Sequence, residues 1–435
     1  MDIILTIVLI ALVVGAILCG APLFSIIGGA AVLLFKFVAE GSMSATIVEM
    51  YRLANAPGII AIPLFIFAGY VFAESNSSKR LIKFSDALLG WLPGGLAVVT
   101  VLVSTIFTAM TGGSGITIIA CGGILLPALI QNKYDEDFSL GYITSVASSG
   151  VLFIPSLPII IYGMVAQIDI TQFFIAATIP ALIIMIVLVV YGIYYGARHK
   201  IPTTPFSIRN VVTSLWEIKW VVPLPVIVIG GIYGGLITVG EAASVTVVYA
   251  MISECLIYQE IGLKKLFEIA INSMITVGAI LVVLGTALGL TNFLVDQEVP
   301  QKLMEFIMQT IHNKYVFLFC LNIFLLIVGC IMDIFSAIVV VVPLIAPVAS
   351  EFSIDPFHLG VIFLANLTIG YITPPVGMNL FISSLRFGIP VMRLYRVVVP
   401  CLIILLIALL LITYIPQMSL FLLDFFGLRT ELIVL

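Results

Sequence analysis

The chain has 435 residues, of which 62% are hydrophobic and only 9% are charged, and its mean hydropathy is +1.29. Soluble domains carry about a quarter charged residues, so this composition excludes an ordinary soluble protein and indicates a polytopic integral membrane protein. The net charge of −4 says little about function, because charge in such a chain is sorted by side of the membrane.

Membrane spans are predicted along almost the whole chain. A span needs about 20 apolar residues, and stretches of this kind lie at 3–19, 22–38, 57–74, 138–163, 170–196, 220–236, 238–257, 266–295, 357–383 and 397–418. We interpret the first stretch as a retained span and not as a signal peptide, because a second apolar run follows at once with no small-residue cleavage site between them. The sequence therefore predicts about 10 spans.

Two further apolar stretches, 97–130 and 315–350, are longer than one span and are interrupted in the middle. The interruptions read TGGSG at 111–115 and MDIFS at 332–336. Each arm would have about 15 residues at a rise of 1.5 Å per residue, which is short for a crossing. The pattern favours two re-entrant helical hairpins. Each is preceded by an amphipathic stretch, 76–92 and 300–312, that is typical of a helix lying in the interface.

The second half of the chain repeats the first. Helix-breaking residues recur with a constant offset of 220, and the matched pairs are Pro127 with Pro347, Gly150 with Gly370, Pro155 with Pro375, and Pro180 with Pro400. An internal duplication explains this register. Basic clusters at 79–83, 198–219, 264–265 and 386–396 predict a cytoplasmic side. Both termini then lie outside, the two hairpins open from opposite sides, and the repeats are inverted.

Each repeat also contains a broken span, SSGVLFIPSLP at 148–158 and TIGYITPPVGMN at 368–379. Irregular backbone at membrane depth persists only where protein or a water-filled cavity covers it. The hairpin tips and breaks are rich in oxygen and almost uncharged: Thr111, Ser114, Ser148, Ser149, Ser156, Ser336, Thr368, Thr373, Asn366 and Asn379. Carbonyls and hydroxyls suit a small hard cation, and half-helix N-termini suit a carboxylate. The breaks therefore predict a cation-coupled anion carrier.

For Asp333, two interpretations stay open: ligation of a cation at membrane depth, or capping of the second arm of its hairpin. For the hydroxyls the alternative is a hydrogen bond to the carbonyl of their own helix. The scattered cysteines and the three histidines show no metal or disulfide spacing. Because no nucleophile and base pair or metal cluster stands out, an intramembrane enzyme is disfavoured.

The chain resembles the large membrane subunit of TRAP transporters, the tripartite ATP-independent periplasmic carriers. The resemblance lies in LPGGLAVVTVLVSTIFTAMTGGSG at 92–115, FIPSLPIIIYG at 153–163, TVGEAASVTVVYA at 238–250 and NLTIGYITPPVGMNLF at 366–381, which is the most specific of the four. The first tip departs from the family pattern, since Gly113 precedes Ser114 where the family has a further hydroxyl.

The resemblance implies an elevator-type fold of the ion-transporter superfamily and coupling to Na+, with two or more ions per substrate. One Na+ site would use Thr111, Ser114, Gly115, Ser149, Gly150 and Pro155, and the other Asp333, Ser336, Thr368, Gly370, Thr373 and Pro375. Substrate, a small organic acid such as a C4-dicarboxylate or sialic acid, would contact Ser114, Ser148, Ser156, Asn366, Gly377 and Asn379.

The implied partners are a small membrane subunit of about four spans, a periplasmic substrate-binding protein and membrane lipid, with no nucleic acid. The implied location is the bacterial inner membrane. Scaffold segments are predicted at 1–56, 57–92, 171–295 and 391–435, and transport-domain repeats at 93–170 and 296–390. A stand-alone cation and organic-anion symporter is the close alternative. An ion channel is less favoured, because channels repeat their filter around one axis and these repeats are inverted.

Overall fold

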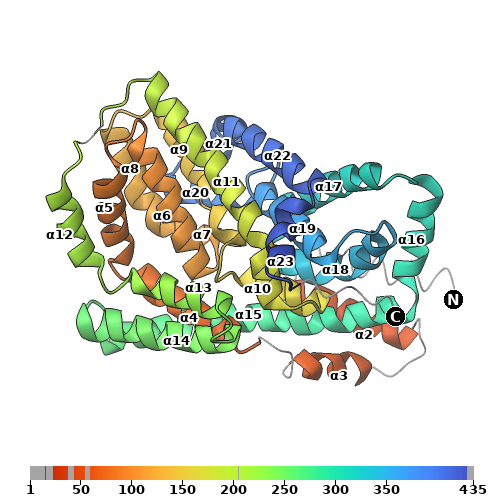
Figure 1. Cartoon of the computed structure of the whole chain (residues 1–435). Helices are drawn as coiled ribbons and strands as arrows, with labels where there is room; N and C mark the ends of the chain where they lie inside the picture. Colours follow the sequence, from red (N-terminus) through yellow and green to blue (C-terminus); the bar gives the residue numbers. More distant parts are fainter. Residues whose placement is uncertain (1–14, 16–22, 38–43, 54–58, 204, 429–435) are drawn as a thin grey trace.

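The structure is a computed structural model, and it describes residue 15 and residues 23–37, 44–53, 59–203 and 205–428 (Figure 1). Every regular element among these residues is helical. The first helices of the described part are α2 (Leu23–Phe37), α3 (Ser44–Leu53) and α4 (Ala61–Glu74). The predicted span at 3–19 lies outside the described residues.

The first repeat runs through α5 (Ser77–Leu89), α6 (Gly95–Thr111), α7 (Ser114–Thr117), a π-helical turn (Ile118–Gly122), α8 (Gly123–Gln131), α9 (Glu136–Val146), a 3-10 turn (Ser149–Leu152), α10 (Leu157–Ala166) and α11 (Ile170–Arg198). The middle of the chain forms α12 (Ile208–Ile218), α13 (Pro223–Tyr233), α14 (Val239–Met251) with a π-helical extension (Ile252–Ile257), and α15 (Leu263–Asp296).

The second repeat runs through α16 (Val299–Thr310), α17 (Lys314–Ile331), α18 (Ile334–Glu351), α19 (Pro356–Gly370), α20 (Met378–Phe387), α21 (Val391–Val397), α22 (Val399–Tyr414) and α23 (Gln417–Phe425). The first break below means residues 147–156, between α9 and α10, and the second break means residues 371–377, between α19 and α20.

By length and apolar composition, 6 described helices could cross a membrane, or up to 9 if each sharply bent helix pair counts as one span. The chain is therefore a multi-pass membrane protein, as its composition predicts. The predicted span at 220–236 contains α13, which has only 11 residues. At 1.5 Å per residue this helix is about 16 Å long, roughly half of a hydrocarbon core of about 30 Å.

The structure confirms the duplication. The helix after the first hairpin tip occupies 114–131 and its counterpart α18 occupies 334–351, so both ends keep the offset of 220. Asp135 caps α9 by accepting the N–H of Phe138, and Asp355 caps α19 by accepting the N–H of Phe357. Pro155 and Pro375 both follow cis peptide bonds. Helices, caps and breaks are thus inherited as one pattern.

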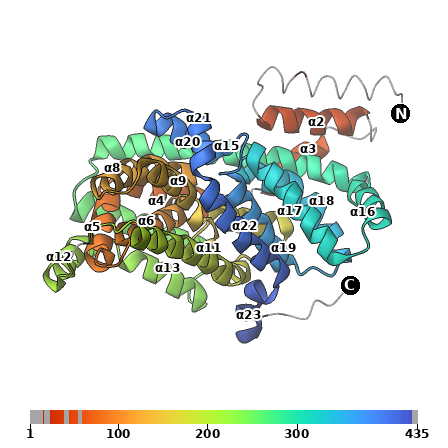
Figure 2. The ribbon, with the colours of Figure 1, turned by 90° about the horizontal axis from the view of Figure 1, so that it is seen from above.

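The two repeats face opposite ways. In both views α5 and α16, the helices that introduce the hairpins, lie at opposite ends of the molecule, with the long helix α15 between them (Figures 1 and 2). The packing is crosswise as well. Helix α10 of the first repeat contacts α18 of the second hairpin, and α20 of the second repeat contacts α7 and the π-helical turn of the first hairpin.

The hairpin arms are longer than the sequence suggested. Helix α6 has 17 residues, and α17 and α18 have 18 each, so the expected arms of about 15 residues were an underestimate. Helix continues to Thr111 at the first tip and to Ile331 at the second. Gly112, at φ +71°, ends α6, and the Asp333 side chain caps the start of α18. The tips nevertheless end inside the protein, since Ser114 is 4% exposed and Ser336 is 2% exposed.

A buried ion cluster joins α5 to the end of the π-helical extension of α14. The Arg80 guanidinium contacts Glu254 at 2.9 Å and Glu260 at 2.6 Å, and it lies 3.7 Å from the centre of the Tyr258 ring. The Glu254 side chain is fully buried, and Ser77 donates to it at 2.8 Å. Among the residues that the structure describes, no ion pair joins α16 to another element.

Candidate functional site

The first hairpin tip meets the second break in the interior. Gly112, at φ +71°, ends α6, and α7 starts at Ser114. The Ser114 hydroxyl donates to the Asn379 amide oxygen at 2.7 Å, across 265 positions of sequence, and Asn379 is completely buried. The Asn379 amide nitrogen donates to the Thr144 carbonyl at 3.4 Å. Two residues predicted to bind substrate therefore lie together, one from each repeat.

The first break also contacts α19, the helix that leads into the second break. The Ser148 hydroxyl, in the first break, donates to the Thr368 carbonyl at 3.4 Å. The Gly377 N–H, in the second break, donates to the Cys330 carbonyl in α17 at 2.9 Å. Gly377 has φ +55°, which a side chain would disfavour. Pro155 is buried, whereas Pro375 is exposed and its carbonyl accepts the Tyr395 hydroxyl.

Threonines of α6 face the first break, a feature that the sequence analysis missed. Thr105 and Ser149 share a hydroxyl hydrogen bond of 2.6 Å. Thr108 contacts the Thr117 hydroxyl at 2.6 Å and donates to the Ala147 carbonyl at 2.6 Å. The sequence contains a pattern that could have indicated this face: Thr105, Thr108 and Thr111 recur every third residue and so share one side of the helix.

Glycines allow the hairpins and breaks to pack with their backbones in contact. A Cβ on Gly150 would lie 2.8 Å from the Thr108 Cβ and closer still to the Thr105 carbonyl oxygen. A Cβ on Gly370 would lie 2.6 Å from the Gly329 carbonyl carbon. A Cβ on Gly115 would lie 2.6 Å from the Ile382 side chain. Close approach explains these glycines without requiring a bound ion.

At the second tip, Asp333 caps α18. Its carboxylate accepts the Ser336 N–H at 3.0 Å and also accepts the Ser336 hydroxyl. The Ile334 N–H donates to the Tyr371 hydroxyl at 2.7 Å. No lysine or arginine within the described ranges pairs with Asp333. The capping interpretation is thus confirmed as geometry, and the carboxylate keeps free acceptor capacity.

Several predicted hydroxyls are bonded within their own segment. The donors and acceptors are Thr111 to Phe107, Thr368 to Leu364, Thr373 to Ile369, and Ser156 to Val151. Hydroxyl oxygens have two lone pairs, so a donated bond leaves each oxygen able to accept or to ligate. The bonds of Thr111 and Thr368 lie within one helix and match the alternative that the sequence left open, whereas Thr373 and Ser156 lie in the breaks.

The Asn366 amide, which was predicted to bind substrate, donates to residues away from the hairpin tips. Its nitrogen donates to the Asn322 amide oxygen in α17 at 2.7 Å and to the Ile362 carbonyl at 2.8 Å. Asn322 in turn donates to the Thr413 hydroxyl in α22 at 3.2 Å. Asn366 thus joins a buried polar chain that links α19, α17 and α22. Nothing in the sequence near Asn366 indicates partners 44 residues away.

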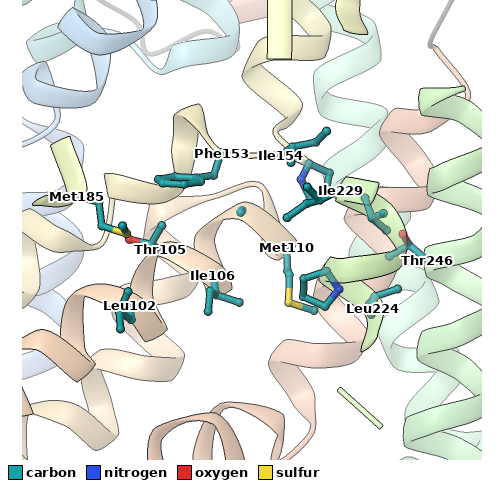
Figure 3. A pocket seen from close by; sticks show the side chains of 14 residues that line it. Leu102, Thr105, Ile106, Met110, Phe153, Ile154, Met185, Leu224, Ile229 and Thr246 are labelled. Carbon is teal, nitrogen blue, oxygen red and sulfur yellow. The ribbon is translucent and has the colours of Figure 1, made fainter. Parts of the chain in front are cut away.

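A cavity of about 270 Å³ adjoins the first break, between α6, α11, α13 and α14 (Figure 3). Its walls are apolar apart from Thr105, which is bonded to Ser149, and Thr246, which donates to the Ala242 carbonyl. An organic anion requires polar partners to replace its hydration. This cavity therefore does not suit a carboxylate, and the polar tips and breaks remain the candidate site.

The possible cation ligands at the tips and breaks are hydroxyl oxygens, amide oxygens and one carboxylate. Among the described residues there is no group of three His, Cys, Asp or Glu that could hold a metal ion. Oxygen-only sites favour hard cations over transition metals. The residues present therefore fit a hard cation such as Na+, which would be held by oxygens of the tips and breaks.

An all-helical membrane protein with two inverted repeats, each carrying a hairpin and a broken helix that meet inside, has the architecture of inverted-repeat membrane transporters. The comparisons specify the family. The profile of the tripartite ATP-independent periplasmic transporter, DctM component, matches residues 8–418. The chain belongs to this family and is a TRAP transporter large permease subunit, as its motifs suggested.

Three relatives are each 32% identical to the chain over the aligned residues. It is 32% identical over 406 residues to the isethionate TRAP transporter permease protein DctMQ of Oleidesulfovibrio alaskensis, covering 92% of this chain and 64% of that protein. It is 32% identical to the C4-dicarboxylate large permease protein DctM of Pseudomonas aeruginosa, covering 92% and 93%. It is 32% identical to the sialic acid large permease protein SiaM of Vibrio cholerae, covering 85% and 86%.

The fold is similar to that of the YdaH transporter of Alcanivorax borkumensis, whose solved structure is described as having an unusual topology. The TM-score is 0.57 with 14% identity, over 83% of this chain and 86% of that chain. At this identity the likeness concerns the fold alone, and it supports the architecture described above.

Proposed function

We propose that this permease carries out Na+-coupled uptake of a small organic acid, as the large subunit of a binding-protein-dependent transporter in the bacterial inner membrane. Both termini would lie on the periplasmic side. Its partners would be a small membrane subunit of about four spans and a periplasmic binding protein. The solute class is inferred from the polar and almost uncharged site together with the names of the relatives. The transport domain would move as an elevator against the scaffold.

The observation that carries this proposal is the junction of Ser114 with Asn379. It brings the N-terminal end of α7, from the first repeat, to the N-terminal end of α20, from the second. Helix N-termini offer N–H groups and positive dipole ends to a carboxylate. Two such ends at one buried place can hold one anionic solute while the neighbouring oxygens hold cations.

The decisive experiment is reconstitution of the permease into liposomes, with and without a small subunit and a binding protein. We expect accumulation of candidate acids only when an inward Na+ gradient and all components are present. Uptake by the permease alone would instead identify a stand-alone symporter. Passive substrate flux that needs neither a Na+ gradient nor a binding protein would contradict both the tripartite transporter and the stand-alone symporter, and it would indicate a channel.

Asp333→Asn tests the cation role of the second tip. Asparagine caps helices as well as aspartate does, so the melting temperature should change little. Loss of the negative charge should weaken the apparent Na+ affinity about tenfold, which corresponds to about 1.4 kcal/mol. Uptake is measured against Na+ concentration.

Asp135→Asn is the matched control, because Asp135 caps α9 in the same way and is exposed. Its Na+ dependence should be that of the wild type. Equal Na+ affinity in Asp333→Asn and wild type would show that Asp333 serves only as a cap.

Ser114→Ala and Asn379→Ala test the junction of the two repeats. Each single change leaves a buried polar partner unsatisfied, which costs about 1–3 kcal/mol. The double variant should cost about 1 kcal/mol less than the sum of the two singles. Thermal unfolding gives the energies, and substrate uptake gives the functional effect. Strict additivity would mean that the bond does not form in the membrane.

A further inference from the structure

Helix α12 lies at the level where several spans end. The candidate span Ile170–Arg198 ends just before it, and the candidate span Leu263–Asp296 begins at the same end of the molecule. Tyr258 directly follows the candidate span Val239–Ile257, and its hydroxyl donates to the Glu217 carbonyl in α12 at 2.6 Å. Helix α12 is bent by 71° from α13, which follows it. In Figure 1 it lies crosswise to the candidate span α15, the orientation expected of a helix that runs along one face of a membrane.

One side of α12 is fixed to the protein. Ser214 and Ile218 are buried, and α12 packs against α5 (Figures 1 and 2). Lys83 of α5 contacts the Glu217 carboxylate at 2.5 Å. Helix α12 is thereby attached to α5, the helix that the Arg80 ion cluster also holds.

The other side of α12 is apolar and uncovered. Ile208, Val212, Leu215 and Trp216 are 71%, 59%, 41% and 70% exposed. Their spacing of four, three and one residues places them on a single stripe. Such a stripe facing water would be unfavourable, and on a helix at the end of several spans it is typical of an interfacial helix.

The rim of this stripe is aromatic and basic. The Lys219 ammonium lies 3.5 Å from the centre of the Trp216 ring and 5.7 Å from that of Trp220. Arg209, at the other end of α12, is exposed. Tryptophan prefers the headgroup level of a bilayer, and lysine and arginine near the surface attract anionic lipid.

We propose that the stripe Ile208, Val212, Leu215 and Trp216 is embedded at the boundary between headgroups and acyl chains of a leaflet that contains anionic phospholipid. Arg209 and Lys219 contact the lipid phosphates. Because Glu217 is bound to Lys83 and Tyr258, this attachment fixes the height of α5 relative to the bilayer. The inference concerns the membrane surface and does not depend on which solute is transported.

The chain has three tryptophans, Trp91, Trp216 and Trp220, which makes a direct test possible. In the full-length double variant Trp91→Phe/Trp220→Phe, only Trp216 emits. The protein is placed in lipid nanodiscs that contain phospholipids brominated at defined acyl positions. We expect blue-shifted emission that is quenched most by bromines nearest the headgroup and little by aqueous acrylamide. Emission that acrylamide quenches and brominated lipids do not would overturn the proposal.

The anionic preference is tested with brominated phosphatidylglycerol against brominated phosphatidylcholine in the same Trp216 variant. Lys219→Gln should lower the preference for phosphatidylglycerol about fivefold. The control is Lys302→Gln on α16, at the opposite end of the molecule, which should leave the preference unchanged. Equal quenching by both lipids before mutation would contradict the proposed contact with anionic headgroups.

Discussion

Gly150→Ala is expected to abolish uptake and to lower the free energy of unfolding by about 3 kcal/mol, at the upper end of typical overpacking costs. The new Cβ would lie 2.8 Å from the Thr108 Cβ and closer still to the Thr105 carbonyl oxygen. The first break would be pushed away from α6, and the contact of Ser149 with Thr105 would be lost. Thermal unfolding in one detergent, together with uptake, measures both effects.

Gly278→Ala provides the control. Gly278 lies within α15, and no atom would come within 4 Å of its added Cβ. Alanine is a better helix former than glycine by up to about 1 kcal/mol, so this variant should be as stable as the wild type or slightly more stable. If Gly150→Ala behaved like Gly278→Ala, the close packing of break and hairpin would be wrong.

Arg80→Ala is expected to reduce stability by about 3 kcal/mol, because it leaves the fully buried Glu254 carboxylate without its cation. The control is Lys83→Ala. The pair of Lys83 with Glu217 is 58% and 40% exposed, and such pairs contribute about 1 kcal/mol or less. The double variant Arg80→Leu/Glu254→Leu should recover much of the stability that Arg80→Ala loses. Melting temperatures should therefore be lowest for Arg80→Ala and higher for Lys83→Ala and the double variant.

The same cluster lowers the pKa of Glu260. Partial burial of this carboxyl would raise its pKa, but the N–H of Asn76 and the Arg80 guanidinium outweigh burial. A carboxylate whose pKa is lower in the folded state stabilises that state above its unfolded pKa, and this stabilisation is lost as the pH falls through the folded pKa. The ordinary value is 4.5, so the contact with Arg80 is intact at neutral pH.

Much of the architecture could be predicted from the sequence. Glycine and proline mark where helices stop, and Gly150, Pro155, Gly370 and Pro375 recur with one offset, so the breaks and the duplication were readable. Positions 111–115 and 332–336 located both hairpin tips. Charge sorting predicted the opposite orientation of the repeats, which the positions of α5 and α16 support (Figures 1 and 2).

The partners of individual side chains could not be predicted in this way. Ser114 contacts Asn379, 265 positions away, and Asn366 contacts Asn322 and not the tips. The sequence places Tyr371 in a motif but does not predict its contact, in which its hydroxyl accepts the Ile334 N–H at the start of α18. Such contacts depend on how the helices rotate when they pack, and periodicity within one segment carries no information about that. The predicted division into scaffold and transport domains, and the Na+ sites, stay predictions.

The two helices that introduce the hairpins, α5 and α16, are held by different forces. Helix α5 is held by charges, whereas α16 covers an apolar cavity of about 260 Å³ between itself and the second hairpin, lined by Leu303, Ile307 and Phe324 among others. Hydrostatic pressure favours arrangements with less internal void. Compression should therefore reduce the void beneath α16 by shifting this helix against its hairpin.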